Sequence, residues 1–131
     1  NRLVIHGWVV MENHLHLIAS SQQLSKEIGL LKSYTARSII DFYKKNHYHK
    51  ILYWLEFFKR PYKKEQDYQL WQEGSQPKEI LSMQMLMNKL NYIHYNPVKS
   101  GYVEEPGYWR YSSYHDYYGD KGMLPVEIIE L

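Results

Sequence analysis

The strongest constraint on the fold is a pair of short apolar segments near the start of the chain. Leu3 to Val10 is rich in Val, Ile and Trp, and a second segment follows from His14 to Ala19. Short runs with this composition are typical of strands. Met11 to Asn13 form a polar break between them. The sequence therefore predicts two adjacent antiparallel strands.

Helical periodicity follows the predicted strands. Apolar residues recur at roughly helical spacing from Leu24 to Lys45, with Lys and Arg between them, and this range is the longest predicted helix. A shorter helix is expected around His49 to Phe58, and Pro61 should stop or redirect it because proline cannot continue a hydrogen-bonded helix. Tyr68 to Gln72 is expected to be a strand.

The second half of the chain predicts one more helix. Ser82 to Tyr95 carries apolar residues at helical spacing, and the helix should end near Asn96 because Pro97 disfavours the helical conformation before it. Gly101 to Leu131 is rich in Tyr, Gly and Pro and is expected to wrap the domain, with Val126 to Ile129 as a candidate final strand. The order of elements predicts an α+β fold with helices packed on an antiparallel sheet.

Length and composition favour one ordinary globular domain. The chain has 131 residues, 44% hydrophobic and 23% charged, and no apolar run approaches the roughly 20 residues of a membrane span. No secretory signal precedes the first strand, so we expect a cytoplasmic protein that does not contact membranes. Because cysteine is absent, any metal would bind imidazole and oxygen ligands.

The net charge of +2 does not by itself indicate a nucleic-acid-binding protein. The stretch from Lys44 to Lys64 nevertheless combines many basic residues, including Lys59 and Arg60, with many aromatic ones. Basic groups can contact phosphates, and exposed aromatic rings can stack on unpaired bases. In the alternative interpretation, the aromatic residues fill the core and the lysines are solvated.

Two histidines of the second strand form a candidate metal site. Side chains two positions apart in a strand point to the same face, so His14 and His16 would project together. Imidazole with oxygen ligands suits zinc, manganese and other divalent ions. The alternative is a pair of partly exposed histidines without a metal.

A second candidate element is the pair Tyr92 and Asn96, which are four positions apart and would share one face of a helix. Tyrosine can act as a nucleophile, and asparagine can supply an oxygen ligand. Alternatively, Tyr92 is a packed aromatic residue and Asn96 is only a helix-terminal residue before proline. His94 would point away from Tyr92, so a core or supporting role is expected for it.

Three blocks of the chain carry a resemblance to a known family. His14-Leu15-His16 is similar to the motif of HUH endonucleases, in which two histidines flank a hydrophobic residue. The longer blocks Val9 to Ile18, Tyr92 to Gly101 and Trp109 to Tyr114 resemble, in the same order, those of REP-associated tyrosine transposases, a single-tyrosine HUH group. The chain starts late relative to this family, which implies that an N-terminal strand and helix are lacking.

The resemblance implies both a fold and a set of roles. The fold would be a ferredoxin-like antiparallel sheet with helices packed on it. His14, His16 and Asn96 would hold Mg²⁺ or Mn²⁺, and Tyr92 would be the nucleophile. The insertion-sequence branch usually has glutamine at the position of Asn96, so asparagine points to the REP-associated branch. Partners would be single-stranded or hairpin DNA, with the protein acting as a monomer or a homodimer.

The implied reaction is DNA cleavage and rejoining through a 5′-phosphotyrosine. A phenol with a pKa near 10 needs a metal or base to attack a phosphodiester at neutral pH. Lys89, Lys99 and Arg110 lie near the motifs and are candidate phosphate partners, although each could be an ordinary solvated charge. Two alternatives remain: a catalytically silent relative that binds DNA hairpins, and a hydrolase that uses metal-bound water without a covalent step.

Overall fold

The two apolar segments at the start of the chain form an antiparallel hairpin of β1 (Val4–Val10) and β2 (Leu15–Ser20). The Met11 N–H donates to the His14 carbonyl at 2.8 Å and closes the turn over Glu12 and Asn13. The predicted strand pair is therefore confirmed within one residue at each end. The computed structural model describes residues 2–57, 59, 68–71, 78–119 and 121–130.

Helix α3 (Met83–Lys99) packs against β1. A Cβ at Gly7 would lie only 2.7 Å from Leu90 Cδ2 and 3.2 Å from Ile93 Cδ1, so glycine at this position permits the close approach of helix and strand. Strand and helix together build the main apolar core. Its buried members are Val9, Met11, Ile18, Leu86, Leu90 and Ile93.

The predicted end of this helix near Asn96 is wrong, because α3 continues through Pro97 to Lys99. Proline lacks only its own N–H, and its ring is fully buried, so packing compensates for the missing bond and the steric restriction. Backbone groups around the end of the helix form local hydrogen bonds. Ser100 N–H donates to the Asn96 carbonyl at 2.9 Å and Tyr102 N–H to the Pro97 carbonyl at 2.9 Å.

The segment after α3 lies along the other edge of β1, as expected for a wrapping segment. After the 3-10 turn η1 (Pro106–Tyr108), the Val10 N–H donates to the Tyr111 carbonyl and the Ser113 N–H to the Trp8 carbonyl, both at 2.9 Å. The short helix α4 (Tyr114–Tyr118) follows directly.

Val126 to Ile129 is not a strand, which corrects the second expectation for this region. The Glu127 N–H donates to the Ile5 carbonyl at 2.9 Å, but the Glu127 carbonyl bonds to the ring Nδ1 of His6 at 3.0 Å. His6 lies at a register irregularity between Ile5 and Gly7. Because a side chain replaces the backbone partner there, no regular ladder forms.

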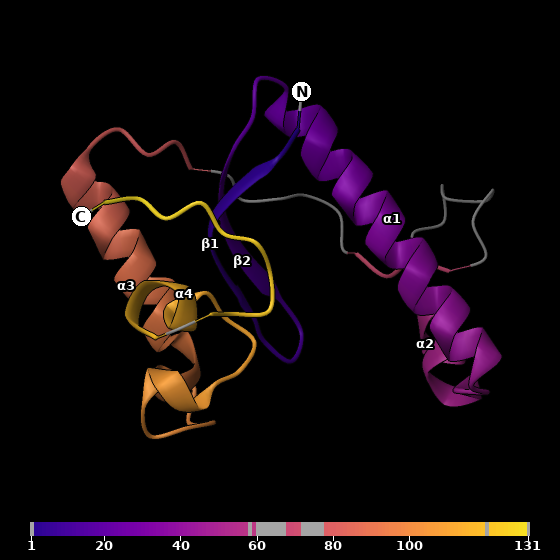
Figure 1. Cartoon of the computed structure of the whole chain (residues 1–131). Helices are drawn as coiled ribbons and strands as arrows, with labels where there is room; N and C mark the ends of the chain where they lie inside the picture. The colour runs from indigo at the N-terminus through magenta and orange to yellow at the C-terminus, as the bar shows by residue number, and fades with distance from the viewer. Residues whose placement is uncertain (1, 58, 60–67, 72–77, 120, 131) are drawn as a thin grey trace. The chain divides into compact units, whose positions relative to one another are not determined.

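The chain divides into two compact units, which are described separately (Figure 1). The sheet unit comprises Asn1–Leu24 and Lys78–Leu131, and contains the hairpin, α3, η1 and α4. The helical unit, Ser25–Pro77, contains most of α1 (Leu24–Lys45) and all of α2 (His49–Phe57). Both predicted helices are confirmed in this unit, although Phe58 and Pro61 lie outside the described residues.

The predicted strand from Tyr68 to Gln72 is wrong over the described residues 68–71. These residues are held by isolated bonds rather than by a ladder. Gln69 N–H donates to the Leu55 carbonyl at 3.1 Å, and the Trp71 indole N–H donates to Thr35 Oγ1 at 2.9 Å. A strand needs a neighbouring strand to bond its backbone, and here the partner is a carbonyl near the end of α2.

The α+β class is confirmed, with a two-stranded antiparallel sheet and four α-helices in the described part of the chain. The ferredoxin-like topology, the single domain and the missing N-terminal elements stay predictions. Within the described ranges, no helix has the length and apolar character needed to cross a bilayer.

Candidate tyrosine and metal centre

Two histidines and a tyrosine meet on the face of the sheet that α3 covers. His16 pairs with Val9, so its side chain lies on the same face as that core residue. The ring centroids of His14 and His16 are 5.0 Å apart, and those of His16 and Tyr92 are 5.5 Å apart, both edge to face. Residues 76 positions apart in the chain thus adjoin, and Tyr92 remains 49% exposed.

The two imidazoles differ in their surroundings. His14 is exposed, and its Nδ1 lies 2.8 Å from the amide oxygen of Asn13. Because that oxygen only accepts hydrogen bonds, Nδ1 carries the proton in this contact, which leaves Nε2 as the nitrogen that could bind a metal ion. Burial lowers the pKa of His16, and the nearby His14 and Lys89 lower it further. His16 therefore favours the neutral form that binds metal ions.

The donor set fits a divalent cation in part. Two imidazoles at this spacing can act as metal ligands, and an amide oxygen on one ring nitrogen is the kind of second interaction that orients a ligating histidine. Among the described residues, no group of three or more His, Cys, Asp or Glu side chains is placed to hold a metal. Further ligands would have to be amide, water or phosphate oxygens.

Asn96 lies one helical turn after Tyr92 on α3, as predicted, but it is buried at 8% exposure. Its amide oxygen accepts a hydrogen bond from the Ser100 hydroxyl at 3.4 Å. Among the described contacts, none joins Asn96 to either histidine. The structure therefore brings His14, His16 and Tyr92 together, whereas a ligand role for Asn96 stays a prediction.

Tyr92 is held in place by the buried side of its own helix. His94 is 2% exposed, and its Nε2 lies 2.7 Å from Ser113 Oγ, which also accepts from the Trp8 N–H at 2.9 Å. Burial lowers the pKa of His94 to about 4, so the ring is neutral at physiological pH. The expected supporting role of His94 is confirmed: it ties α3 to β1 through Ser113.

The predicted basic residues are dispersed. Lys89 is half-buried one turn before Tyr92 and acts electrostatically on His16, so it lies at the centre. Lys99 and Arg110 are exposed in the sheet unit, in the last turn of α3 and after η1. Lys59 belongs to the helical unit, and Arg60 lies outside the described residues.

Three supporting residues escape the sequence-based interpretation: Glu12, Asn13 and Tyr102. Asn13 was treated only as part of a polar break, although its place directly before His14 is a usable signal for a side chain that orients the ring. The hydrogen bond between Tyr102 and Glu12 joins residues far apart in sequence, and no pattern in the chain indicates it. Trp109 packs against the core, and Ser112 and Ser113 accept loop and ring hydrogen bonds.

Comparison with known proteins gives one partial relationship. No family model and no solved structure matches the chain. Over 46 residues the chain is 48% identical to a Haemophilus influenzae protein named "Putative REP-associated tyrosine transposase". The aligned part covers 35% of this chain and only 26% of that protein, so the chain spans about a quarter of its relative's length. The chain is thus similar, over about a third of its length, to a protein named as a transposase.

Proposed function

We propose that this protein is a metal-dependent DNA transposase or single-strand endonuclease that cleaves and rejoins DNA through Tyr92. The observation that carries the proposal is the edge-to-face contact of Tyr92 with His16, next to His14. A half-exposed phenol beside two imidazoles that could hold a metal ion is an arrangement that suits nucleophilic attack by tyrosine. The partial similarity to a protein named as a transposase supports DNA as the substrate.

The proposed step is a phosphoryl transfer. The Tyr92 oxygen bonds to phosphorus, and the bond between phosphorus and the 3′-oxygen of the preceding nucleotide breaks. The phenolic proton passes to solvent, which reaches the half-exposed ring, and the departing 3′-oxygen takes up a proton from water. The products are a 5′-phosphotyrosine and a free 3′-hydroxyl. Attack by another 3′-hydroxyl reverses these bond changes and joins the strands without a nucleotide cofactor.

The chain's own residues bind and orient the reacting groups. His14 and His16 would hold Mg²⁺ or Mn²⁺, with Asn96 as the proposed third ligand, and the cation would stabilise negative charge on the phosphate oxygens. The ammonium group of Lys89 lies close enough to lower the pKa of His16 and is the nearest proposed phosphate partner. Lys99 and Arg110 would contact phosphates further along a single strand or hairpin.

The test is a covalent adduct between protein and DNA. The protein is incubated with Mn²⁺ and a labelled pool of single-stranded oligonucleotides of random sequence, and adducts are resolved on a denaturing gel. We expect an adduct that chelation abolishes. Tyr92→Phe should abolish it, whereas Tyr95→Phe should not, and Tyr95 is a matched control because it lies on α3 with 50% exposure.

Other outcomes identify the alternatives. Cleavage of DNA without protein on the 5′ end would overturn the tyrosine mechanism in favour of hydrolysis by water. Binding without cleavage would indicate a catalytically silent DNA-binding protein. An adduct that persists in Tyr92→Phe would mean that the nucleophile is misassigned.

A further inference from the structure

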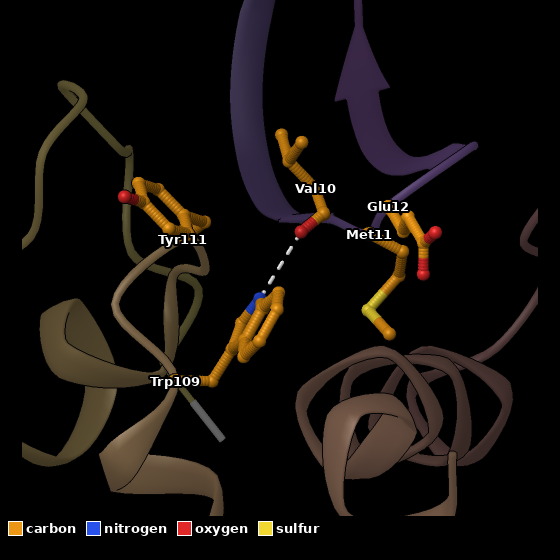
Figure 2. Close-up of a pocket in the computed structure, with 5 residues that line it drawn as sticks. All are labelled: Val10, Met11, Glu12, Trp109 and Tyr111. Atoms are coloured by element: carbon orange, nitrogen blue, oxygen red, sulfur yellow. Dashed lines mark hydrogen bonds between the residues drawn. The ribbon is translucent and has the colours of Figure 1, made fainter. Parts of the chain in front are cut away.

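A shallow pocket of about 280 Å³ opens beside the hairpin turn, outside the histidine and tyrosine centre. Figure 2 shows the Trp109 ring standing against the end of β1, with its indole N–H directed at the Val10 carbonyl at 3.1 Å. The Glu12 carboxylate lies beyond Met11 in the same view. The lining residues are Val10, Met11, Glu12, Trp109 and Tyr111.

Aromatic rings form one side of this pocket. The Trp109 ring centroid is 5.9 Å from that of Tyr111 and 5.4 Å from that of Tyr102. Tyr102 and Tyr111 are each 48% exposed, so these rings offer uncovered surface. The backbone beneath is fixed, because the Val10 N–H donates to the Tyr111 carbonyl at 2.9 Å. A rigid, partly open group of aromatic rings is the kind of surface on which unpaired bases stack.

A carboxylate lies on the other side of the pocket. Glu12 accepts a hydrogen bond from the Tyr102 hydroxyl, and this bond raises the pKa of the phenol, so Tyr102 stays a donor. The ionised carboxylate has further lone pairs, so it can accept additional hydrogen bonds but cannot donate any. It would repel a phosphate but would accept from an amino group on a base edge, as acidic side chains do with cytosine N4.

The pocket adjoins the hairpin turn that leads to His14. The Met11 N–H donates to the His14 carbonyl at 2.8 Å, so a pocket residue and a candidate metal ligand are bonded across the same turn. A base held in the pocket would therefore lie next to the turn that carries His14.

We propose that this pocket binds one unpaired, amino-bearing base of the single-stranded substrate, stacked on the aromatic side and hydrogen-bonded to Glu12. The proposal rests on the proposed function for its DNA substrate. It assigns base recognition to residues other than the basic side chains, which are the proposed phosphate partners. Cytosine and thymine separate stacking from the hydrogen bond to Glu12. The two bases have similar size, but at the same ring position cytosine carries an amino group and thymine a carbonyl.

The first experiment tests Glu12. Dissociation constants of labelled dC10 and dT10 are measured by fluorescence anisotropy at pH 8. The dissociation constant for dT10 divided by that for dC10 is then compared between the wild type and the variants. Glu12→Gln keeps an acceptor for Tyr102 but should lower this ratio about fivefold. Glu104→Gln, which removes the same charge from an exposed position outside the pocket, should keep the wild-type ratio. Equal ratios in the two variants would overturn the assignment of Glu12.

The second experiment tests the aromatic side. Tyr111→Ala should weaken binding of both oligonucleotides about tenfold, within the range for loss of one stacked base. Tyr108→Ala removes a 67% exposed tyrosine that does not line the pocket and should leave both constants within about twofold of the wild type. The proposed stacking surface is wrong if the two variants weaken binding equally.

The adduct assay separates this proposal from the proposed function. Only the pocket assignment fails if the wild-type protein forms the Tyr92 adduct while Glu12→Gln and Tyr111→Ala bind both oligonucleotides as their control variants do. If the protein neither forms an adduct nor binds either oligonucleotide, the DNA function itself fails, and the pocket proposal falls with it.

Discussion

The sheet unit and the helical unit are built in different ways. In the sheet unit, strand residues pack against a helix about 80 positions later, and Val9, Leu90 and Ile93 are no more than 3% exposed. In the helical unit, Leu52 is the sole described residue that is buried, and α1 has none. Burial of apolar residues thus fixes the unit that carries Tyr92, whereas the other unit relies on helical hydrogen bonds and individual side-chain contacts such as that of Trp71 with Thr35.

The same difference explains where the candidate site lies. Catalytic side chains must keep a defined geometry, and they do so when packing and hydrogen bonds fix the elements that carry them. His94 and Ser113 do this for α3. Exposed apolar side chains occur in both units, for example Tyr34 at 68% in the helical unit and Leu81 at 77% in the sheet unit, so the two units differ in how many residues they bury rather than in what they expose.

Truncating one leucine in each unit should give the largest contrast. Leu90→Ala removes a 2% exposed core side chain and should lower the free energy of unfolding by about 2–5 kcal/mol. Leu30→Ala removes a 55% exposed side chain and should change it by less than about 0.5 kcal/mol. Urea unfolding followed by circular dichroism measures both. Equal losses would remove the distinction between the two units.

Acid should destabilise the sheet unit through His94. Its pKa is about 4 in the folded protein against 6.5 in the unfolded chain, so the unfolded state binds more protons between these values. Stability is therefore lost as the pH falls from 6.5 to 4, by about 3 kcal/mol in all. His16, whose pKa is also lowered, adds to the loss.

Urea titrations at pH 7 and pH 5 measure this dependence. His94→Gln should remove most of it, because glutamine does not titrate. His49→Gln, at an exposed position of the helical unit, should leave it unchanged. If the free energy of unfolding still falls between pH 7 and pH 5 in His94→Gln, His94 is not the cause of the acid destabilisation.

Adding a methyl group at glycine should have opposite signs in the two units. Gly7→Ala places Cβ 2.7 Å from Leu90 Cδ2 in a filled core and should destabilise by about 1–3 kcal/mol. Gly29→Ala in α1 meets nothing within 4 Å and should stabilise by about 0.5–1 kcal/mol, since alanine favours helices. Thermal unfolding measures both changes, and a stabilising Gly7→Ala would show that α3 can move away from β1.

The smallest effect is expected at a hydrogen bond of the helical unit. Thr35→Val removes the acceptor for the Trp71 indole N–H, bonded at 2.9 Å, and should cost about 0.5–1.5 kcal/mol. Ser38→Ala changes an exposed residue of the same helix and serves as the control. Chemical denaturation monitored by tryptophan fluorescence compares the two. If Thr35→Val and Ser38→Ala have the same free energy of unfolding, the Trp71 contact does not stabilise this unit.

Local patterns predicted the elements well where local interactions determine them. The periodicity of α1 marked Leu24 and Lys45 as its ends, and the polar break marked the hairpin turn. The end of α3 was missed because burial of Pro97 outweighs its local preference. The bond between His94 and Ser113 joins residues 19 positions apart through the fold, and no periodicity reports such a contact.

In the candidate site, too, some features follow from local sequence patterns and others from long-range packing. Spacing alone placed His14 beside His16, and helical geometry placed Asn96 one turn from Tyr92. That Tyr92 meets His16 depends on how α3 packs on β1, which local sequence rules do not determine. The order of the three blocks nevertheless pointed to two histidines and a tyrosine whose rings adjoin in the structure.

The central claim is that the Tyr92 oxygen becomes bonded to DNA, and peptide mapping of the covalent adduct tests it most directly. Trypsin cuts after Lys89 and Lys99, so one peptide, LNYIHYNPVK, contains both Tyr92 and Tyr95. After nuclease trimming, fragmentation by tandem mass spectrometry locates the remaining nucleotide. We expect a 5′-phosphonucleotide on Tyr92 alone. A modification on Tyr95, or on a residue of any other peptide, would contradict the assignment.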